Sequence, residues 1–194
     1  MPRAEEADEL LVARAQRGDA AAFGTLVQRY QDALFNSVCR MVGHREDAED
    51  LTQEALVKAF HGIGAFRGQS SFYTWLYAIA YNTVVSYRRK AGGAHHLNPL
   101  PLPDASGHEG RGHEAEDKGE RPDAAAERRE LLRRLEEAIA SLQDEHRAIV
   151  VMRDVEGFDY REIAELLGCA QGTVKSRLHR ARQALRELLQ DLME

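Results

Sequence analysis

Apolar side chains recur at gaps of three and four along most of this 194-residue chain, which predicts amphipathic helices and no convincing strand. One helix is expected to start at an Asp19 cap and end at Gly43. Two more should run from about Arg45 to Phe60 and from Ser70 or Ser71 onward. Together they predict a helical bundle over residues 8 to about 90. Its expected buried positions are Phe23, Leu26, Val27, Tyr30, Leu34, Val38, Met41, Ala48, Leu51, Ala55, Phe60, Phe72, Leu76, Ile79 and Thr83.

The helical pattern stops between Gly92 and about Asp123. Residues 93–126 hold four of the five prolines and carry 3 basic against 7 acidic side chains. Such a stretch buries too little apolar surface to offset its ordering entropy, so we predict a flexible acidic linker. Four histidines lie in it without a fixed site nearby, and we interpret them as solvated residues rather than metal ligands: His95, His96, His108 and His113.

Helical spacing resumes near Ala124 and continues through a further helix at about Asp144–Val155, until Gly157 interrupts it. The fold class predicted is therefore all-α, with two small helical domains, residues 1–92 and 127–194, joined by the flexible linker 93–126. The expected core positions of this second block are Leu131, Leu135, Ala138, Ile139, Leu142, Ile149, Val150 and Met152.

The chain ends in two helices joined by a short turn. Asp159 is expected to cap the first, with Glu162 three residues later in a capping-box arrangement, and Gly168 to end it. A tight glycine-containing turn followed by a basic helix predicts a helix-turn-helix. The side chains expected to face inward are Ile163, Ala164, Leu167, Val174, Leu178, Ala181, Leu185 and Leu188.

Charge is unevenly distributed although the chain as a whole carries −6. The stretch from Thr173 to Arg186 contains five cations and no acid: Lys175, Arg177, Arg180, Arg182 and Arg186. Local charge outweighs the total because salt screens charges beyond roughly 10 Å. With the apolar stripe inside, Lys175, Ser176, Arg177, His179 and Arg180 are expected outside, where arginine can pair with guanine. A solvated basic face is the alternative.

Composition excludes several classes of protein. No apolar run approaches the roughly 20 residues needed to cross a bilayer, and the acidic N-terminus does not resemble a secretory signal. Cys39 and Cys169 lie far apart without ligand-spaced partners, so we expect a reduced, cytoplasmic protein with no disulfide, metal site or cofactor. Cys169 is interpreted as a small buried residue rather than an oxidant sensor. No nucleophile or phosphate-binding glycine loop is present, which predicts that the chain is not an enzyme.

Two further patterns are ambiguous by themselves. Of the 13 aromatic residues, eight lie between Phe60 and Tyr87, followed by the basic run Arg88–Lys90. Aromatics beside cations suit single-stranded DNA, although an aromatic-rich helix is more often core. The helix from Arg45 carries an acidic face that is either merely solvated or binds a basic protein surface.

Three segments resemble bacterial sigma factors of the extracytoplasmic-function group. Asp47–Phe60 (DAEDLTQEALVKAF) is similar to their polymerase-binding helix, and Phe66–Asn82 (FRGQSSFYTWLYAIAYN) to their promoter-melting segment. Gly172–Arg182 (GTVKSRLHRAR) resembles their −35 recognition helix. The three occur in the family's order, in two helical domains joined by a linker.

The resemblance implies a role for particular residues. Contact with the clamp coiled coil of the largest polymerase subunit is implied for Asp50, Leu51, Gln53 and Glu54. Contact with the unpaired −10 strand is implied for Phe66, Arg67, Ser70, Ser71, Phe72, Tyr73, Asn82 and Arg88. Recognition of the −35 element is implied for Thr173, Lys175, Ser176, Arg177, His179 and Arg180.

The function predicted is therefore promoter selection and strand opening for bacterial RNA polymerase, with promoter DNA and the polymerase core as partners. The resemblance also implies control by an anti-sigma factor. Two alternatives remain open at this point. A stand-alone helix-turn-helix regulator would bind duplex DNA tightly by itself, and a protein-interaction adaptor would not need the basic helix.

Overall fold

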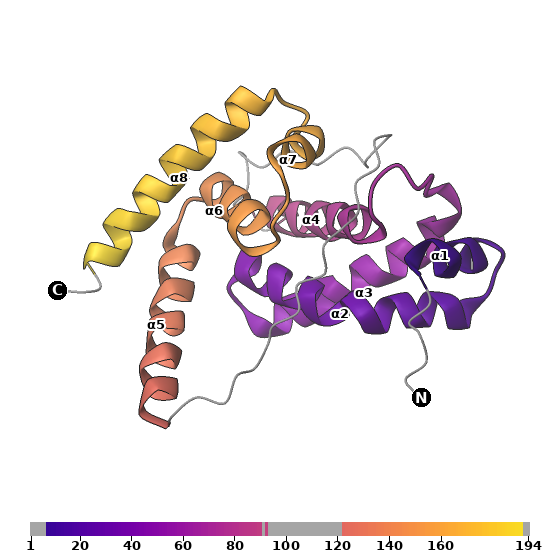
Figure 1. Ribbon diagram of the computed structural model, residues 1–194, viewed down its shortest axis with the longest axis horizontal. Coiled ribbons are helices and arrows are strands. Elements are labelled where there is room, and N and C mark those ends of the chain that lie inside the picture. Colours follow the sequence, from indigo (N-terminus) through magenta and orange to yellow (C-terminus); the bar gives the residue numbers. More distant parts are fainter. Residues whose placement is uncertain (1–6, 91, 93–121, 192–194) are drawn as a thin grey trace. The chain divides into compact units, whose positions relative to one another are not determined.

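The computed structural model describes residues 7–90, 92 and 122–191, with side chains from residue 128 onward in the second range. Secondary structure in these residues is helical throughout, which confirms the predicted all-α class (Figure 1). None of the described helices is long and apolar enough to cross a membrane. The linker histidines lie outside the described residues, and the domain boundaries stay a prediction. Helical structure begins again at Pro122, within the range predicted as linker.

The N-terminal unit is built around one long helix. That helix, α2, packs against the three other helices of the unit. The elements are α1 (Asp8–Gln16), α2 (Ala20–Val42), α3 (Arg45–Gly62), the 3₁₀ turn η1 (Ile63–Ala65) and α4 (Phe72–Lys90).

The ends of α2 follow from single residues, as the sequence predicted. The Asp19 carboxylate accepts the backbone N–H groups of Ala21 and Ala22 at 3.0 and 3.2 Å. It also pairs with Arg14 at 2.7 Å, and this hydrogen-bonded guanidinium lowers the pKa of the Asp19 carboxyl. Gly43 ends α2 in the left-handed conformation, with φ of 81°, which glycine adopts without a steric penalty.

Most of the predicted core positions of this unit are buried, including Leu26, Leu34, Val38 and Leu76. Val27 and Tyr30 are only half-buried. The prediction for Phe60 was wrong, because its side chain is 45% exposed and the neighbouring Ala59 is buried instead. The helix continues to Gly62 rather than ending at Phe60, and its buried stripe falls on smaller residues, namely Ala48, Leu51, Thr52, Ala55 and Ala59.

The C-terminal unit contains the predicted helix-turn-helix. Its helix α8 packs against α6 and α5, so the final helix is held by the two that precede the motif. The elements are α5 (Pro122–Ser141), α6 (Asp144–Val150), the π-helical turn η2 (Val151–Val155), α7 (Tyr160–Leu167) and α8 (Gln171–Asp191).

Burial in this unit departs from the sequence pattern at its ends. The positions buried as predicted are Ala138, Ile139, Leu142, Ile149, Val150, Met152, Ile163, Ala164, Val174, Leu178 and Ala181. Leu131 was wrongly placed in the core, since it is 62% exposed. Leu166, not Leu167, is the buried residue of its pair. Leu135, Leu167, Leu185 and Leu188 are half-buried, because only part of each helix lies against its neighbours.

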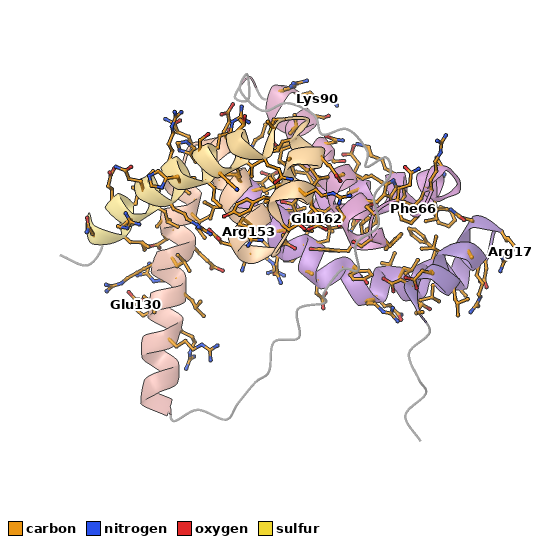
Figure 2. All side chains as sticks on the ribbon, turned by 45° about the horizontal axis from the view of Figure 1, so that its top comes forward. Arg17, Phe66, Lys90, Glu130, Arg153 and Glu162 are labelled. Carbon is orange, nitrogen blue, oxygen red and sulfur yellow. The ribbon has the colours of Figure 1, made fainter. Side chains whose placement is uncertain are left out.

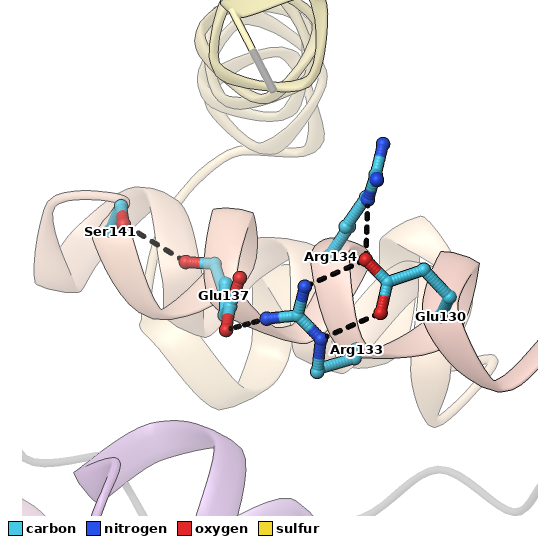
Figure 3. Close-up of polar contacts among 5 residues, drawn as sticks. All are labelled: Glu130, Arg133, Arg134, Glu137 and Ser141. Carbon is cyan, nitrogen blue, oxygen red and sulfur yellow. Dashed lines mark hydrogen bonds and ion pairs between the residues drawn. The ribbon is translucent and has the colours of Figure 1, made fainter. Parts of the chain in front are cut away.

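Exposed ion pairs connect charged side chains in the middle of α5 (Figure 3). Arg133 binds Glu130 at 2.7 Å and also pairs with Glu137, while Arg134 binds Glu130 at 2.8 Å. These two hydrogen-bonded guanidinium groups lower the pKa of Glu130 to about 2. Pairs three and four residues apart lie on one side of a helix and support it, although exposed pairs such as these contribute little to stability.

The junction between α5 and α6 depends on one arginine. Arg147 is only 11% exposed, and its guanidinium donates to the carbonyl oxygens of Ile139 at 3.1 Å and Leu142 at 2.8 Å. It also donates to the Ala140 carbonyl and pairs with Asp144 at 3.1 Å. The last turn of a helix leaves its carbonyls without intrahelical donors. Arg147 therefore caps α5 and fixes the direction in which α6 leaves it.

Replacing this arginine tests its capping role. We expect Arg147→Met to lower the free energy of unfolding of the C-terminal unit by about 1–3 kcal/mol, because several partly buried carbonyls lose their donor. Chemical denaturation followed by circular dichroism measures the change. Arg133→Met is the matched control, since it removes an exposed ion-paired arginine of α5 and should lower the midpoint much less. Equal effects of the two substitutions would contradict the account.

Candidate nucleic-acid and polymerase-binding surfaces

The orientation of α8 is set by three buried side chains. Val174, Leu178 and Ala181 are 0%, 2% and 0% exposed, so the opposite side of the helix faces outward. The six residues predicted to recognise the −35 element all lie on that side or at its edge. Four of them are exposed, namely Lys175, Ser176, His179 and Arg180, and two are half-buried, namely Thr173 and Arg177.

The start of α7 has the predicted capping geometry. Asp159 accepts the backbone N–H of Glu162 at 2.8 Å, and the Glu162 carboxylate accepts the backbone N–H of Asp159 at 2.7 Å. This reciprocal pair confirms the capping box at the start of α7. Gly168 ends α7 with φ of 58°, and the chain re-enters a helix at Gln171. Local sequence thus determines where the first helix of the helix-turn-helix begins and ends.

The contacts of Tyr160, beside α8, were not predicted from the sequence. The Arg153 guanidinium and the Lys175 ammonium both lie over the ring of Tyr160, at the start of α7, at 4.9 and 5.6 Å from its centroid. Arg182 of α8 pairs with Asp154, with 3.1 Å from Nε to the carboxylate, which raises the pKa of Arg182. Figure 2 shows Arg153 within this unit. No periodic signal marks Arg153 and Asp154, because their placement depends on the π-helical turn η2.

The α3 helix presents the predicted acidic face. Asp50, Gln53 and Glu54 are exposed, while Leu51 is 5% exposed and holds the helix to the core. Glu54 pairs with Lys58 at 2.6 Å, so part of its charge is compensated within the helix. Apolar surface adjoins these residues, since Val57 is 56% exposed. Val57 was not among the positions predicted to be buried in this helix.

The aromatic run is mainly core. Phe66 and Phe72 are 7% and 3% exposed, and both rings contact Trp75, with centroid distances of 5.1 and 5.8 Å. Phe66 lies among the side chains of the N-terminal unit (Figure 2). Tyr77 is also fully buried. Tyr73 differs, because it is half-buried and stacks on Tyr30 at 5.2 Å. Of the three aromatics predicted to meet the −10 strand, only Tyr73 presents part of its ring to solvent.

Hydrogen bonds from α1 hold the loop that precedes α4. Gln16 of α1 donates to the carbonyl oxygens of Ile63 at 3.1 Å and Phe66 at 2.6 Å, a contact that the sequence did not reveal. Ser71 caps α4 by accepting the backbone N–H of Thr74 at 3.0 Å. The predicted DNA-contacting residues of this loop are Arg67, which is exposed, and Ser70 and Ser71, which are half-buried.

The last two predicted −10 residues lie farther along α4. Asn82 and Arg88 are both half-buried. The Arg88 guanidinium donates to the Met41 carbonyl at 2.5 Å. It thereby supplies a hydrogen-bond donor to a carbonyl in the last turn of α2, where intrahelical donors are lacking. This engagement is structural, and contact with DNA would have to be made by the rest of the guanidinium. Within the described ranges, no group of three or more His, Cys, Asp or Glu side chains is arranged to hold a metal ion.

Comparison with known proteins gives matches at both ends of the chain. The family model for sigma-70 region 2 matches residues 26–93, and the model for sigma-70 region 4 matches residues 132–185. The first contains α3 and α4, and the second contains the helix-turn-helix. The two matches therefore fall on the two surfaces that the geometry singles out.

Similar proteins match over nearly the whole length. The RNA polymerase sigma-H factor of Pseudomonas aeruginosa is 39% identical over 189 residues, which is 97% of each chain. The ECF RNA polymerase sigma-E factor of Escherichia coli K12 is 37% identical over 186 residues, 96% of each chain.

Two solved structures share the fold. CnrH in complex with the cytosolic domain of CnrY superposes with a TM-score of 0.66, at 25% identity over 96% of this chain and 99% of that one. The sigma factor RpoE of Bartonella quintana, in complex with the anti-sigma factor NepR, superposes with a TM-score of 0.63, at 26% identity over 87% and 96%. Sequence identity, the two family models and the fold agree, and the chain belongs to the ECF group of sigma-70-type RNA polymerase sigma factors.

Proposed function

We propose that this chain binds the core of bacterial RNA polymerase, directs it to specific promoters and helps to open the strands there. The observation that carries the proposal is the outward face of α8, where cations without an intervening acid lie opposite a fully buried apolar stripe. A helix held in this way can enter the major groove and present side chains to base edges. Family membership supports the same role.

Recognition of the −35 element is assigned to six residues of α8. Arg177 and Arg180 have the donor geometry to bind guanine bidentately, whereas Lys175 and Ser176 suit phosphate oxygens or base edges. The set proposed to contact this element is Thr173, Lys175, Ser176, Arg177, His179 and Arg180.

The acidic face of α3 is proposed to bind the clamp coiled coil of the largest polymerase subunit. It cannot face DNA, because its carboxylates would repel phosphate. Asp50, Gln53 and Glu54 would make the polar contacts, and the exposed Val57 would add apolar area. Leu51 is buried and would act by holding the helix in place.

The loop 66–71 and α4 are proposed to hold the unpaired −10 strand. Trapping an unpaired base favours strand opening because the base no longer restacks. Arg67, Ser70, Ser71 and Tyr73 reach the surface and would contact the strand, together with Asn82 and Arg88. The buried rings of Phe66 and Phe72 would instead form the floor of that site.

The remaining parts of the proposal concern partners and setting. The polymerase performs the chemistry, so this chain is proposed to have no enzymatic activity of its own and to act in the cytoplasm. Control by an anti-sigma factor is proposed, supported by the two solved relatives that are bound to proteins of this kind or to a cytosolic partner domain.

Removing two arginines from α8 tests promoter recognition. We expect Arg177→Ala/Arg180→Ala to reduce promoter-dependent transcription at least about tenfold when core polymerase is present, because each bidentate base contact contributes about 1–3 kcal/mol. Runoff transcription in vitro measures it. The control, Arg128→Ala/Arg133→Ala, removes two cations from the exposed side of α5 and should stay fully active. Full activity of the α8 variant would instead favour a protein-interaction adaptor.

Charge reversal on α3 tests polymerase binding. Asp50→Lys/Glu54→Lys should weaken binding to core polymerase by about tenfold or more, because like charges then face a basic partner. Fluorescence titration of the labelled full chain with core enzyme reports this affinity. Asp32→Lys, an exposed acid on α2, is the control for charge alone. Unchanged affinity of the α3 variant, or an equal loss in the control, would contradict the assignment.

A further inference from the structure

The aromatic ring at the start of α7 brings two cations from different elements to one place. Tyr160 is half-buried, with the Arg153 guanidinium 4.9 Å and the Lys175 ammonium 5.6 Å from its ring centroid. Both distances lie within the range in which the electron-rich face of an aromatic ring attracts a cation. Arg153 comes from η2 and Lys175 from the first turns of α8.

The backbone around η2 explains why Arg153 lies there. In this π-helical turn the Glu156 N–H donates to the Val151 carbonyl at 2.9 Å, and the Phe158 N–H to the Met152 carbonyl at 3.0 Å. Arg153 in turn donates to the Phe158 carbonyl at 2.7 Å. Its guanidinium is thereby tied to the segment that immediately precedes Tyr160. An insertion of this kind in a helix often marks a functional position.

The charge of Lys175 remains uncompensated. A neighbouring cation of α8, Arg182, is paired with Asp154 at 3.1 Å. Lys175 has no carboxylate partner among the described residues, although it is exposed on the face proposed to meet DNA. An aromatic ring holds an ammonium without neutralising it, so the charge stays available to a stronger anionic partner.

We propose that Tyr160 is a positioning residue for promoter binding, whose ring holds Lys175 and Arg153 as a preformed pair of cations that binds the phosphate backbone beside the −35 element. The ligand class is a phosphodiester. A flexible lysine loses rotamer freedom on binding, and the ring removes part of that loss in advance. This inference rests on the proposed function of α8, and it adds Tyr160 of α7 to the residues that serve DNA binding.

The test is a double-mutant cycle in the reconstituted holoenzyme, with full-length chain and core polymerase. Affinity for a promoter fragment active in runoff transcription is measured at several salt concentrations. Tyr160→Leu should weaken binding about two- to fivefold, and Tyr160→Phe, which keeps the ring, should bind as the unaltered chain does. Lys175→Met should reduce the slope of log affinity against log salt by about one. Adding Tyr160→Leu to Lys175→Met should cause less further loss than Tyr160→Leu does alone.

A spectroscopic measurement needs no variant that could misfold. In the unaltered chain, the side-chain methylene protons of Lys175 should resonate upfield of ordinary lysine values because the Tyr160 ring current shields them. NMR of the selectively labelled protein measures this shift. A Lys175 signal at ordinary values would overturn the proposal. So would additive losses in the cycle, or a Tyr160→Phe variant as weak as Tyr160→Leu, which would assign the effect to the hydroxyl.

Failure of this inference and failure of the proposed function give different results. If the chain does not direct polymerase to promoters, the unaltered holoenzyme shows no promoter-dependent transcription, whatever the Lys175 resonances show. If only the inference is wrong, the unaltered holoenzyme is active and Tyr160→Leu either has no effect or acts independently of Lys175.

Discussion

Burial of one apolar stripe on α8 determines what the C-terminal unit offers to a partner. Val174, Leu178 and Ala181 are almost completely removed from solvent, and burying such side chains contributes on the order of 1.5–3 kcal/mol for each of the larger two. Rotation of the helix would expose them, so the helix has one favourable orientation. The basic side chains between them must then face outward. The side chains that α8 can offer to DNA are therefore determined by which of its residues pack in the core.

The two units carry opposite kinds of surface, which the net charge of −6 conceals. Acidic side chains gather on the exposed face of α3, and cations gather on that of α8. A factor that must bind both a basic protein surface and DNA needs this separation, because mixing the two would weaken each contact.

The sequence predicted those features that depend on local chemistry. Helix class, the Asp19 cap, the capping box at Asp159 and the exit at Gly43 each follow from one residue type and its near neighbours. The buried stripe of α8 follows from spacing alone. Such features need no knowledge of which elements meet, and this is why periodicity found them.

Other features depend on contacts between elements distant along the chain. The sequence placed Phe60 and Leu131 inside, but where a helix stops touching its neighbours is a tertiary property. The sequence predicted that Phe72 is buried but did not show that Phe66, which precedes the helix, would pack against Trp75 as well. The carbonyls bound by Arg147 and the ring that holds Lys175 were equally hidden. Each joins groups that no local pattern connects.

We conclude that this chain gives promoter specificity to a polymerase. Reconstituted transcription on genomic fragments with core enzyme, followed by mapping of the start sites, tests this conclusion. We expect a limited set of starts, each preceded by the same two sequence elements at a fixed spacing, and none when either the chain or the core is omitted. Tight, sequence-specific binding of duplex DNA by the chain alone, without such starts, would contradict it.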